Sequence, residues 1–163
     1  MGTFNAKILA EFQPPRKWKL GRDLTYSTKD LMGDEIKALQ DIGVKVNRDT
    51  DISPVDITVP TEFMTDLAST PRALWAFIAP FDVARAAIVH DLLYKTIRQY
   101  RWNKGDIEED KTLIKKAKVV ADKVFLLAMK DAQPKVSGWK IYSAWKAVDL
   151  FGRWSIIPNE KNI

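Results

Sequence analysis

The residues best suited to chemistry are a single histidine and the acids that interrupt apolar stretches of the chain. His90 stands directly before Asp91 in the apolar run 83–94, and Asp122 interrupts a second apolar run at 119–125. Ionisable groups in such runs are costly to bury unless they are paired, hydrogen-bonded or bound to a metal. These positions therefore mark a candidate site.

Further polar residues are spaced so that they could join this site. Tyr94 falls one helical turn after His90, on the same helix face. Asp122 would reach His90 if their two helices pack antiparallel. Asp66 and Ser69 lie upstream, and they would join if their loop folds over the end of the helix that carries His90.

Four uses of these residues are consistent with their types. A divalent metal (Mn, Fe, Mg or Zn) held by His90, Asp91, Asp66 and Asp122 would activate water for hydrolysis. A relay would use Ser69 as nucleophile and His90 as base. His90 and Asp91 alone could perform acid–base catalysis. In the fourth use, the residues form only a structural hydrogen-bond network.

The composition narrows these choices. The chain has no cysteine, which excludes thiol nucleophiles, disulfides and cysteine-based zinc sites. With one histidine, a zinc site would be mostly carboxylate, so Mn, Fe or Mg would fit better than zinc. Ser69 is equally suited to cap a helix, and it lacks the glycines of an exposed nucleophile turn. The structural network is favoured, because buried polar groups are usually just hydrogen-bonded.

Length and charge bound the class of protein. The 163 residues, 46% of them hydrophobic, predict one globular domain spanning 1–163. The net charge of +5 permits an acidic partner without requiring one, and nucleic acid is a less favoured partner. No stretch approaches the roughly 20 apolar residues of a membrane span, and the N-terminus lacks a signal-peptide core. We therefore expect the chain in the cytoplasm or within a larger assembly.

The apolar patterning predicts an α+β fold, in which a small N-terminal antiparallel sheet or hairpins precede a bundle of three to four helices. Residues 1–60 form the mainly β part, 61–152 the helical part and 153–163 an irregular tail. The expected strands are 6–12, 18–20, 24–27, 44–46 and 55–59. Helical spacing is expected at 30–39, 71–79, 82–100, 106–131 and 137–152.

Two helical segments carry side chains with simpler interpretations. On the last helix, Trp139, Tyr142 and Trp145 recur every three residues, which we interpret as core rather than partner contact. On the long helix before it, several lysines follow acids at helical spacing and predict a solvated face. These lysines are Lys111, Lys115, Lys116 and Lys118.

Several ordered segments resemble a phage and prophage family, domain of unknown function 1353. The run 59–72 resembles its opening signature, a valine-proline followed by threonine-aspartate-x-alanine-serine-x-proline. Residues 86–94 resemble its second motif and 121–129 its third. Residues 142–152 look like its closing helix and glycine, so the resemblance covers about 55–152.

The resemblance implies a phage origin and supplies no activity. It marks Asp66, Ser69, His90, Asp91 and Asp122 as the family's polar motif positions. The leading hypothesis is a virion-associated protein, a tail or head-to-tail component or an assembly accessory, whose partners are other phage structural proteins. Such a protein would be in the host cytoplasm during assembly and then in the virion.

Two rival hypotheses remain. One is a phage hydrolase, metal-dependent or not, that acts on cell wall or a phosphoester through the His/Asp cluster. The other is a small binding protein that counters a host defence. The hydrolase requires that His90 meets Asp66, Asp91 and Asp122 around one pocket.

Overall fold

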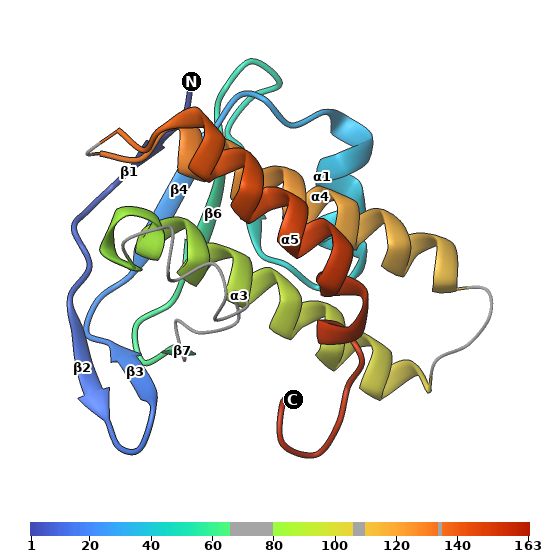
Figure 1. The fold of residues 1–163 in the computed structure, drawn as a ribbon. Coiled ribbons are helices and arrows are strands. Elements are labelled where there is room, and N and C mark those ends of the chain that lie inside the picture. The colour runs from blue at the N-terminus through green and yellow to red at the C-terminus, as the bar shows by residue number, and fades with distance from the viewer. Residues whose placement is uncertain (66–79, 106–109, 134) are drawn as a thin grey trace.

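A computed structural model describes residues 1–65, 80–105, 110–133 and 135–163. The described residues form short strands followed mainly by long helices (Figure 1). The strands are β1 (Thr3–Phe4), β2 (Ala10–Gln13), β3 (Lys17–Leu20), β4 (Leu24–Thr28), β5 (Val46–Asn47), β6 (Val55–Val59) and β7 (Met64–Thr65). The helices are α1 (Gly33–Asp41), α3 (Pro80–Lys104), α4 (Lys111–Lys130) and α5 (Gly138–Ser155).

The strands form two small antiparallel sheets. One has the order β1-β4-β6-β5 and the other has the order β2-β3-β7. In β4 and β6 every second side chain is buried, so one face of the larger sheet points into the core. The predicted α+β class, with antiparallel strands before helices, is confirmed.

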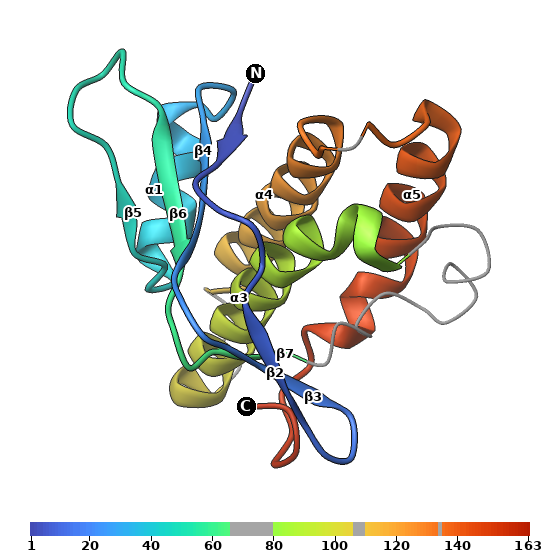
Figure 2. The same ribbon diagram turned by 90° about the vertical axis from the view of Figure 1, so that its left-hand side faces the viewer.

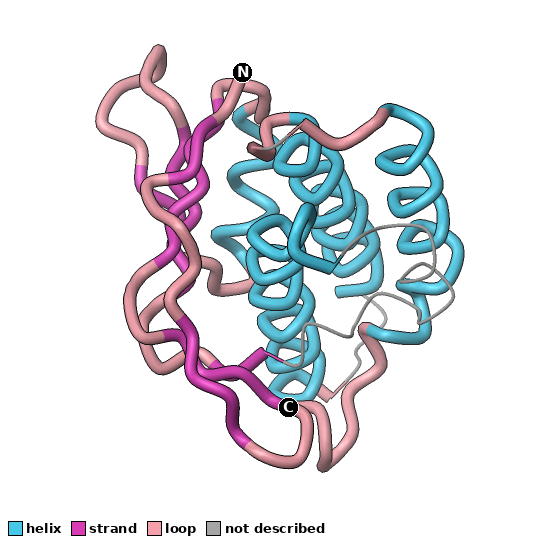
Figure 3. Tube along the Cα trace, turned by 60° about the vertical axis from the view of Figure 1, so that its left-hand side comes forward, coloured by secondary structure: helices cyan, strands magenta, loops and turns pink. Residues whose placement is uncertain are grey.

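The helices are arranged in layers beside the larger sheet. Helix α3 contacts β4 and β6, α4 packs on α3 and α1, and α5 packs on α4 (Figure 2). Figure 1 shows α4 running antiparallel to α3, and α5 antiparallel to α4. The strands lie to one side of the helices in Figure 3. Helix α5 is therefore the outer layer of the described fold.

Two polar contacts fix the sheet and α1 against α4. Tyr26 in β4 donates to Asp131, just after α4, over 2.7 Å. Burial and this carboxylate both raise the pKa of Tyr26, which keeps the phenol neutral. Lys123 in α4 pairs with Glu35 in α1 at 2.7 Å. The two contacts set the position of α4, which carries part of the candidate site.

Several element boundaries differ from the sequence expectation. The strand expected at 6–12 is the shorter β2, Ala10–Gln13, it is preceded by the unexpected β1, and the strand expected at 44–46 is Val46–Asn47. Helix α3 continues to Lys104 through residues expected to be a connection. The helix expected at 106–131 is α4, which begins at Lys111; its expected residues 106–109 lie outside the described residues. The helix expected at 71–79 also lies outside the described residues. Polar residues at helix ends make such boundaries weakly specified.

Candidate functional site

Helix α3 is buried almost all round where it carries the histidine. Between residues 83 and 94 every side chain is buried except Arg85 and Leu92, which are half-buried. A helix that is apolar on all sides has to lie inside the fold. Since α3 lies between the sheet and α4, both His90 and Asp91 are carried into the interior.

His90 meets Asp122 of α4 across the antiparallel helix pair. His90 Nε2 lies 3.2 Å from Asp122 Oδ1, and the two residues are 4% and 3% exposed. The imidazole also contacts the rings of Tyr94 and Phe125, with centroids 4.0 Å and 4.9 Å away. An ionised carboxylate only accepts hydrogen bonds, so Nε2 carries the proton in this contact.

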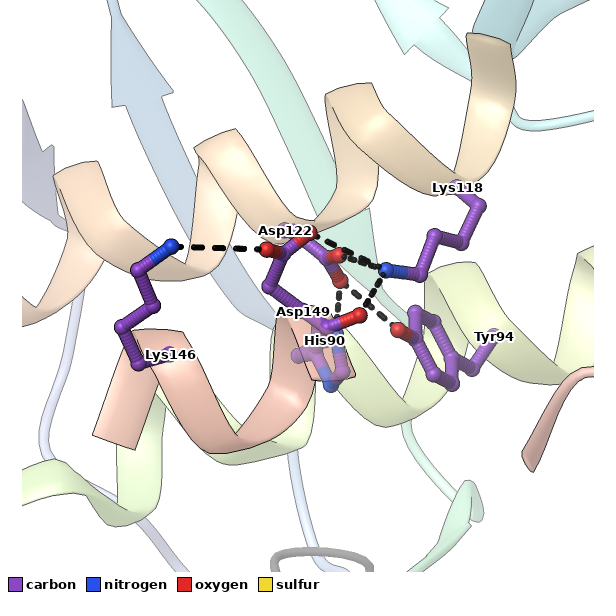
Figure 4. A network of polar contacts seen from close by, with 6 residues as sticks. All are labelled: His90, Tyr94, Lys118, Asp122, Lys146 and Asp149. Carbon is purple, nitrogen blue, oxygen red and sulfur yellow. Dashed lines mark hydrogen bonds and ion pairs between the residues drawn. The ribbon is translucent and has the colours of Figure 1, made fainter. Parts of the chain in front are cut away.

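Asp122 is the centre of the network drawn in Figure 4. Tyr94 donates to its Oδ1 over 2.7 Å, and Lys118 Nζ lies 2.7 Å from its Oδ2. The lysine contact is an ion pair rather than an aligned hydrogen bond. Lys118 also donates to the backbone oxygen of Asp149 over 2.9 Å. The network therefore joins α3, α4 and α5.

The surroundings of Asp122 favour its charged form. Burial raises the pKa of this carboxyl, but the hydrogen bond and charge of His90 and the contacts with Lys118 and Tyr94 outweigh it, so the pKa is lowered. Burial, together with the charge and hydrogen bond of Asp122, raises the pKa of Tyr94. At neutral pH the network holds an ionised aspartate and a neutral phenol.

Gly152 lets α5 approach the network closely. A Cβ atom at this position would lie 2.0 Å from Tyr94 Oη and 3.1 Å from Lys118 Cε. Two of the four buried positions on α5 hold alanine or glycine, which permits this approach. The buried residues of the helix are Ile141, Ala144, Val148 and Gly152.

The structure places the predicted site residues in different surroundings. His90 and Asp122 are together, because α4 packs antiparallel to α3, the condition that the sequence analysis set for this contact, and Tyr94 joins them. Asp91 is buried elsewhere on α3, where it accepts a hydrogen bond from Thr65. The predictions for Asp66 and Ser69 lie outside the described residues.

A metal centre needs more ligands than the described residues bring together. Within ranges 1–65, 80–105, 110–133 and 135–163, no group of three or more histidine or acidic side chains is placed to hold a metal ion. His90 and Asp122 supply two potential ligands. The ammonium of Lys118 beside Asp122 would repel a cation at that point. The proposed set of His90, Asp91, Asp66 and Asp122 stays a prediction.

Two expectations from the sequence were wrong. Lys118 does not belong to a solvated face, since it is 8% exposed and paired with Asp122. Trp139 and Tyr142 are not core residues, because each is 58% exposed, while Trp145 is half-buried. A charged residue four positions before a buried acid was the signal that could have identified Lys118.

The outer face of α5 is rich in exposed aromatic and apolar side chains. Three basic side chains on the same helix lie over tryptophan rings, Lys140 over Trp139, Lys146 over Trp145 and Arg153 over Trp154. Together these side chains form what we call the α5 face. The exposed large members are Trp139, Tyr142, Leu150, Phe151 and Trp154.

The fold and this network define an α+β protein whose three long helices are joined by a buried histidine, aspartate, tyrosine and lysine. The chain belongs to the DUF1353 family of proteins of unknown function, whose model matches residues 41–148. Comparison with curated proteins and with solved structures gives no match. All four network side chains lie inside the matched region, whereas Asp149 and Gly152 lie just beyond it.

The arrangement has a limited chemical repertoire. An imidazole whose Nε2–H is bound to a carboxylate has a basic Nδ1, as in general-base pairs. The same contacts also occur in purely structural networks, which rigidify a core when every member is satisfied. In the part of the chain that the structure describes, no helix has the length and apolar character needed to cross a membrane.

Proposed function

We propose that the protein is a non-catalytic assembly component that binds another protein through the α5 face. The observation that carries the proposal is the exposure of large apolar side chains along one helix, with Trp139 and Trp154 at 58% and 54%. Several large apolar side chains exposed on one helix are typical of interaction sites in soluble proteins. Tryptophan, tyrosine and arginine are also the residues that dominate binding energy at interfaces.

The chemistry of the face defines the partner that would fit it. Lys140, Lys146 and Arg153 lie among the aromatic rings, and Asp149 is the acidic side chain beside Lys146. A complementary surface would offer an apolar groove with carboxylates at its rim. The resemblance to phage proteins supports a partner within a phage particle, either a tail or a head-to-tail component. The chain would then pass from the host cytoplasm into the virion.

The buried network supports this role by holding α5 in place. Lys118 bonds to the α5 backbone at Asp149, and Tyr94 packs directly on Gly152. Binding surfaces perform best on elements whose positions are fixed by packing and hydrogen bonds. In this interpretation His90 and Asp122 are positioning residues that present the α5 face.

The proposal includes the phage origin that the resemblance implies, and its test is quantitative mass spectrometry of particles purified from a host that carries the gene for this chain. The wild-type chain should be present at a fixed copy number. The double variant Trp139→Ser with Trp154→Ser should fold and be depleted at least about tenfold, since each hot-spot side chain contributes about 2 kcal/mol. Trp102→Ser, on α3 and 48% exposed, is the matched control and should be incorporated normally. Absence of the wild-type chain, or full incorporation of the double variant, would overturn the proposal.

A second candidate is a hydrolase that uses His90 and Asp122 without Asp91, and it is favoured by the His90–Asp122 contact, which has the form of a base and its orienting carboxylate. Its test is hydrolysis of peptidoglycan and of a generic phosphodiester, with and without Mn²⁺. The hydrolase predicts turnover that His90→Gln abolishes while the variant remains folded. Turnover that is absent, or equal in the variant, would remove this candidate.

A further inference from the structure

A small charged cavity lies on the side of α3 that carries Asp91, away from the network. It has a volume of about 160 Å³. Its walls come from β3, the end of β7, helix α3 and the chain near residue 162. Arg98 fixes the last of these walls, because its Nε donates to the backbone oxygen of Asn162 over 2.7 Å. Segments far apart in the sequence thus meet at one cavity.

Basic side chains dominate the cavity lining. Lys17, Lys95, Arg98 and Lys161 are cationic, and Asp91 is the acidic side chain among the lining residues. Within the described residues, no ion pair is formed by Lys17, Lys95 or Lys161. Clustered cations around a low-dielectric hollow attract anions, and the effect is stronger than on an open surface.

The acid of the cavity is buried and held in place. Asp91 is 8% exposed and accepts a hydrogen bond from the hydroxyl of Thr65, itself a buried residue at the end of β7. A carboxylate has about four acceptor sites, so Asp91 can accept from a hydroxyl or ammonium group of a ligand in addition to the contacts that it already makes. The cavity therefore offers an anion-attracting rim and one acceptor.

We propose that this cavity binds a small molecule that carries an oxyanion, phosphate or carboxylate, together with a hydroxyl or ammonium donor. The oxyanion lies among Lys17, Lys95 and Lys161, and the donor faces Asp91. The volume is well below the roughly 300 Å³ at which pockets for drug-sized ligands begin, so a nucleotide is too large. The site is independent of the α5 face and of the proposed assembly role.

The test is isothermal titration calorimetry with three ligands of similar size. Glycerol 3-phosphate and glycerate carry a phosphate or a carboxylate beside hydroxyl groups, and glycerol carries only the hydroxyls. We expect at least one of the two anions to bind with a dissociation constant below about 1 mM, and glycerol not to bind at that concentration. The stronger of the two anions identifies the oxyanion that the cavity prefers.

Matched lysine variants locate the binding. The double variant Lys95→Gln with Lys161→Gln should bind the preferred anion at least about tenfold more weakly than the wild type. Raised salt concentration should also weaken the binding of this anion to the wild type. Lys29→Gln with Lys130→Gln removes the same charge from exposed positions outside the cavity and should leave affinity unchanged. Failure of both anions to bind more tightly than glycerol would overturn the inference. Equal affinity of the two double variants for the anion would also overturn it.

Discussion

Gly152 and Tyr94 provide a quantitative test of how closely α5 packs on α3. A Cβ atom at residue 152 would lie 2.0 Å from Tyr94 Oη, where ordinary contact begins near 3.4 Å. Gly152→Ala therefore has to displace a hydroxyl that donates to Asp122 over 2.7 Å. Overpacking destabilises a fold by about 1–3 kcal/mol, and the loss of a hydrogen bond to a charged group destabilises it by about 1.5–3 kcal/mol. The higher helix propensity of alanine offsets about 1 kcal/mol of this loss. We therefore expect Gly152→Ala to lower the free energy of unfolding by about 1.5–5 kcal/mol.

The double-mutant cycle isolates the contact. Tyr94→Phe alone should lower the free energy of unfolding by about 1.5–3 kcal/mol, because Asp122 loses one donor. In that background Gly152→Ala no longer meets the hydroxyl, and its next contact is the ring carbon Cζ, at 3.0 Å. The double variant should therefore be more stable than the sum of the single effects by about 1.5–3 kcal/mol.

Urea denaturation followed by circular dichroism measures all four proteins. Gly138→Ala is the control on the same helix, since its added Cβ would meet nothing within 4 Å. It should change stability by less than about 1 kcal/mol. Effects of Gly152→Ala and Tyr94→Phe that add within about 0.5 kcal/mol would refute the close approach of α5 to Tyr94.

Further predictions concern the charges of the network. Lys118→Met should lower the free energy of unfolding, measured by urea denaturation, by about 3 kcal/mol, because Asp122 loses a buried partner. Lys116→Met breaks the exposed ion pair with Asp34 and should lower the free energy of unfolding by less than about 1 kcal/mol. Equal costs would contradict the burial of Lys118. The folded-state pKa of Asp122 is below its ordinary 3.8, so the unfolded state binds more protons as pH falls through this range, and acid lowers the free energy of unfolding. Asp122→Asn should flatten this dependence below pH 3.8; an unchanged slope would show that other carboxyls cause it.

Regular patterns in the sequence predicted the central elements of the fold. The alternation at 55–59 predicted β6, whose side chains alternate between buried and half-buried positions. The apolar run around His90 predicted a buried helix, and its spacing placed Tyr94 on the side of His90, whereas the contact with Asp122 was expected only for antiparallel packing of the two helices. Periodicity of this kind reports which side of an element faces the core.

The surroundings of α5 could not be predicted by the same means. Its aromatic residues suggested the core, but its buried positions are aliphatic or glycine, and Gly152 lies directly against Tyr94 of α3. Which face of a helix is buried depends on how closely its neighbour approaches, and that is a tertiary property. The burial of Lys118 is likewise set by Asp122 and Asp149, which come from different helices.

The central claim is that His90 is a buried donor to Asp122, and NMR tests it directly because the chain has only one histidine. A long-range ¹H–¹⁵N spectrum of the imidazole at neutral pH should show a proton on Nε2 that exchanges slowly with water. Asp122→Ala should abolish the slow exchange. An Nε2 without a proton, or exchange as fast as that of a free imidazole, would contradict the network on which the proposed role of His90 rests.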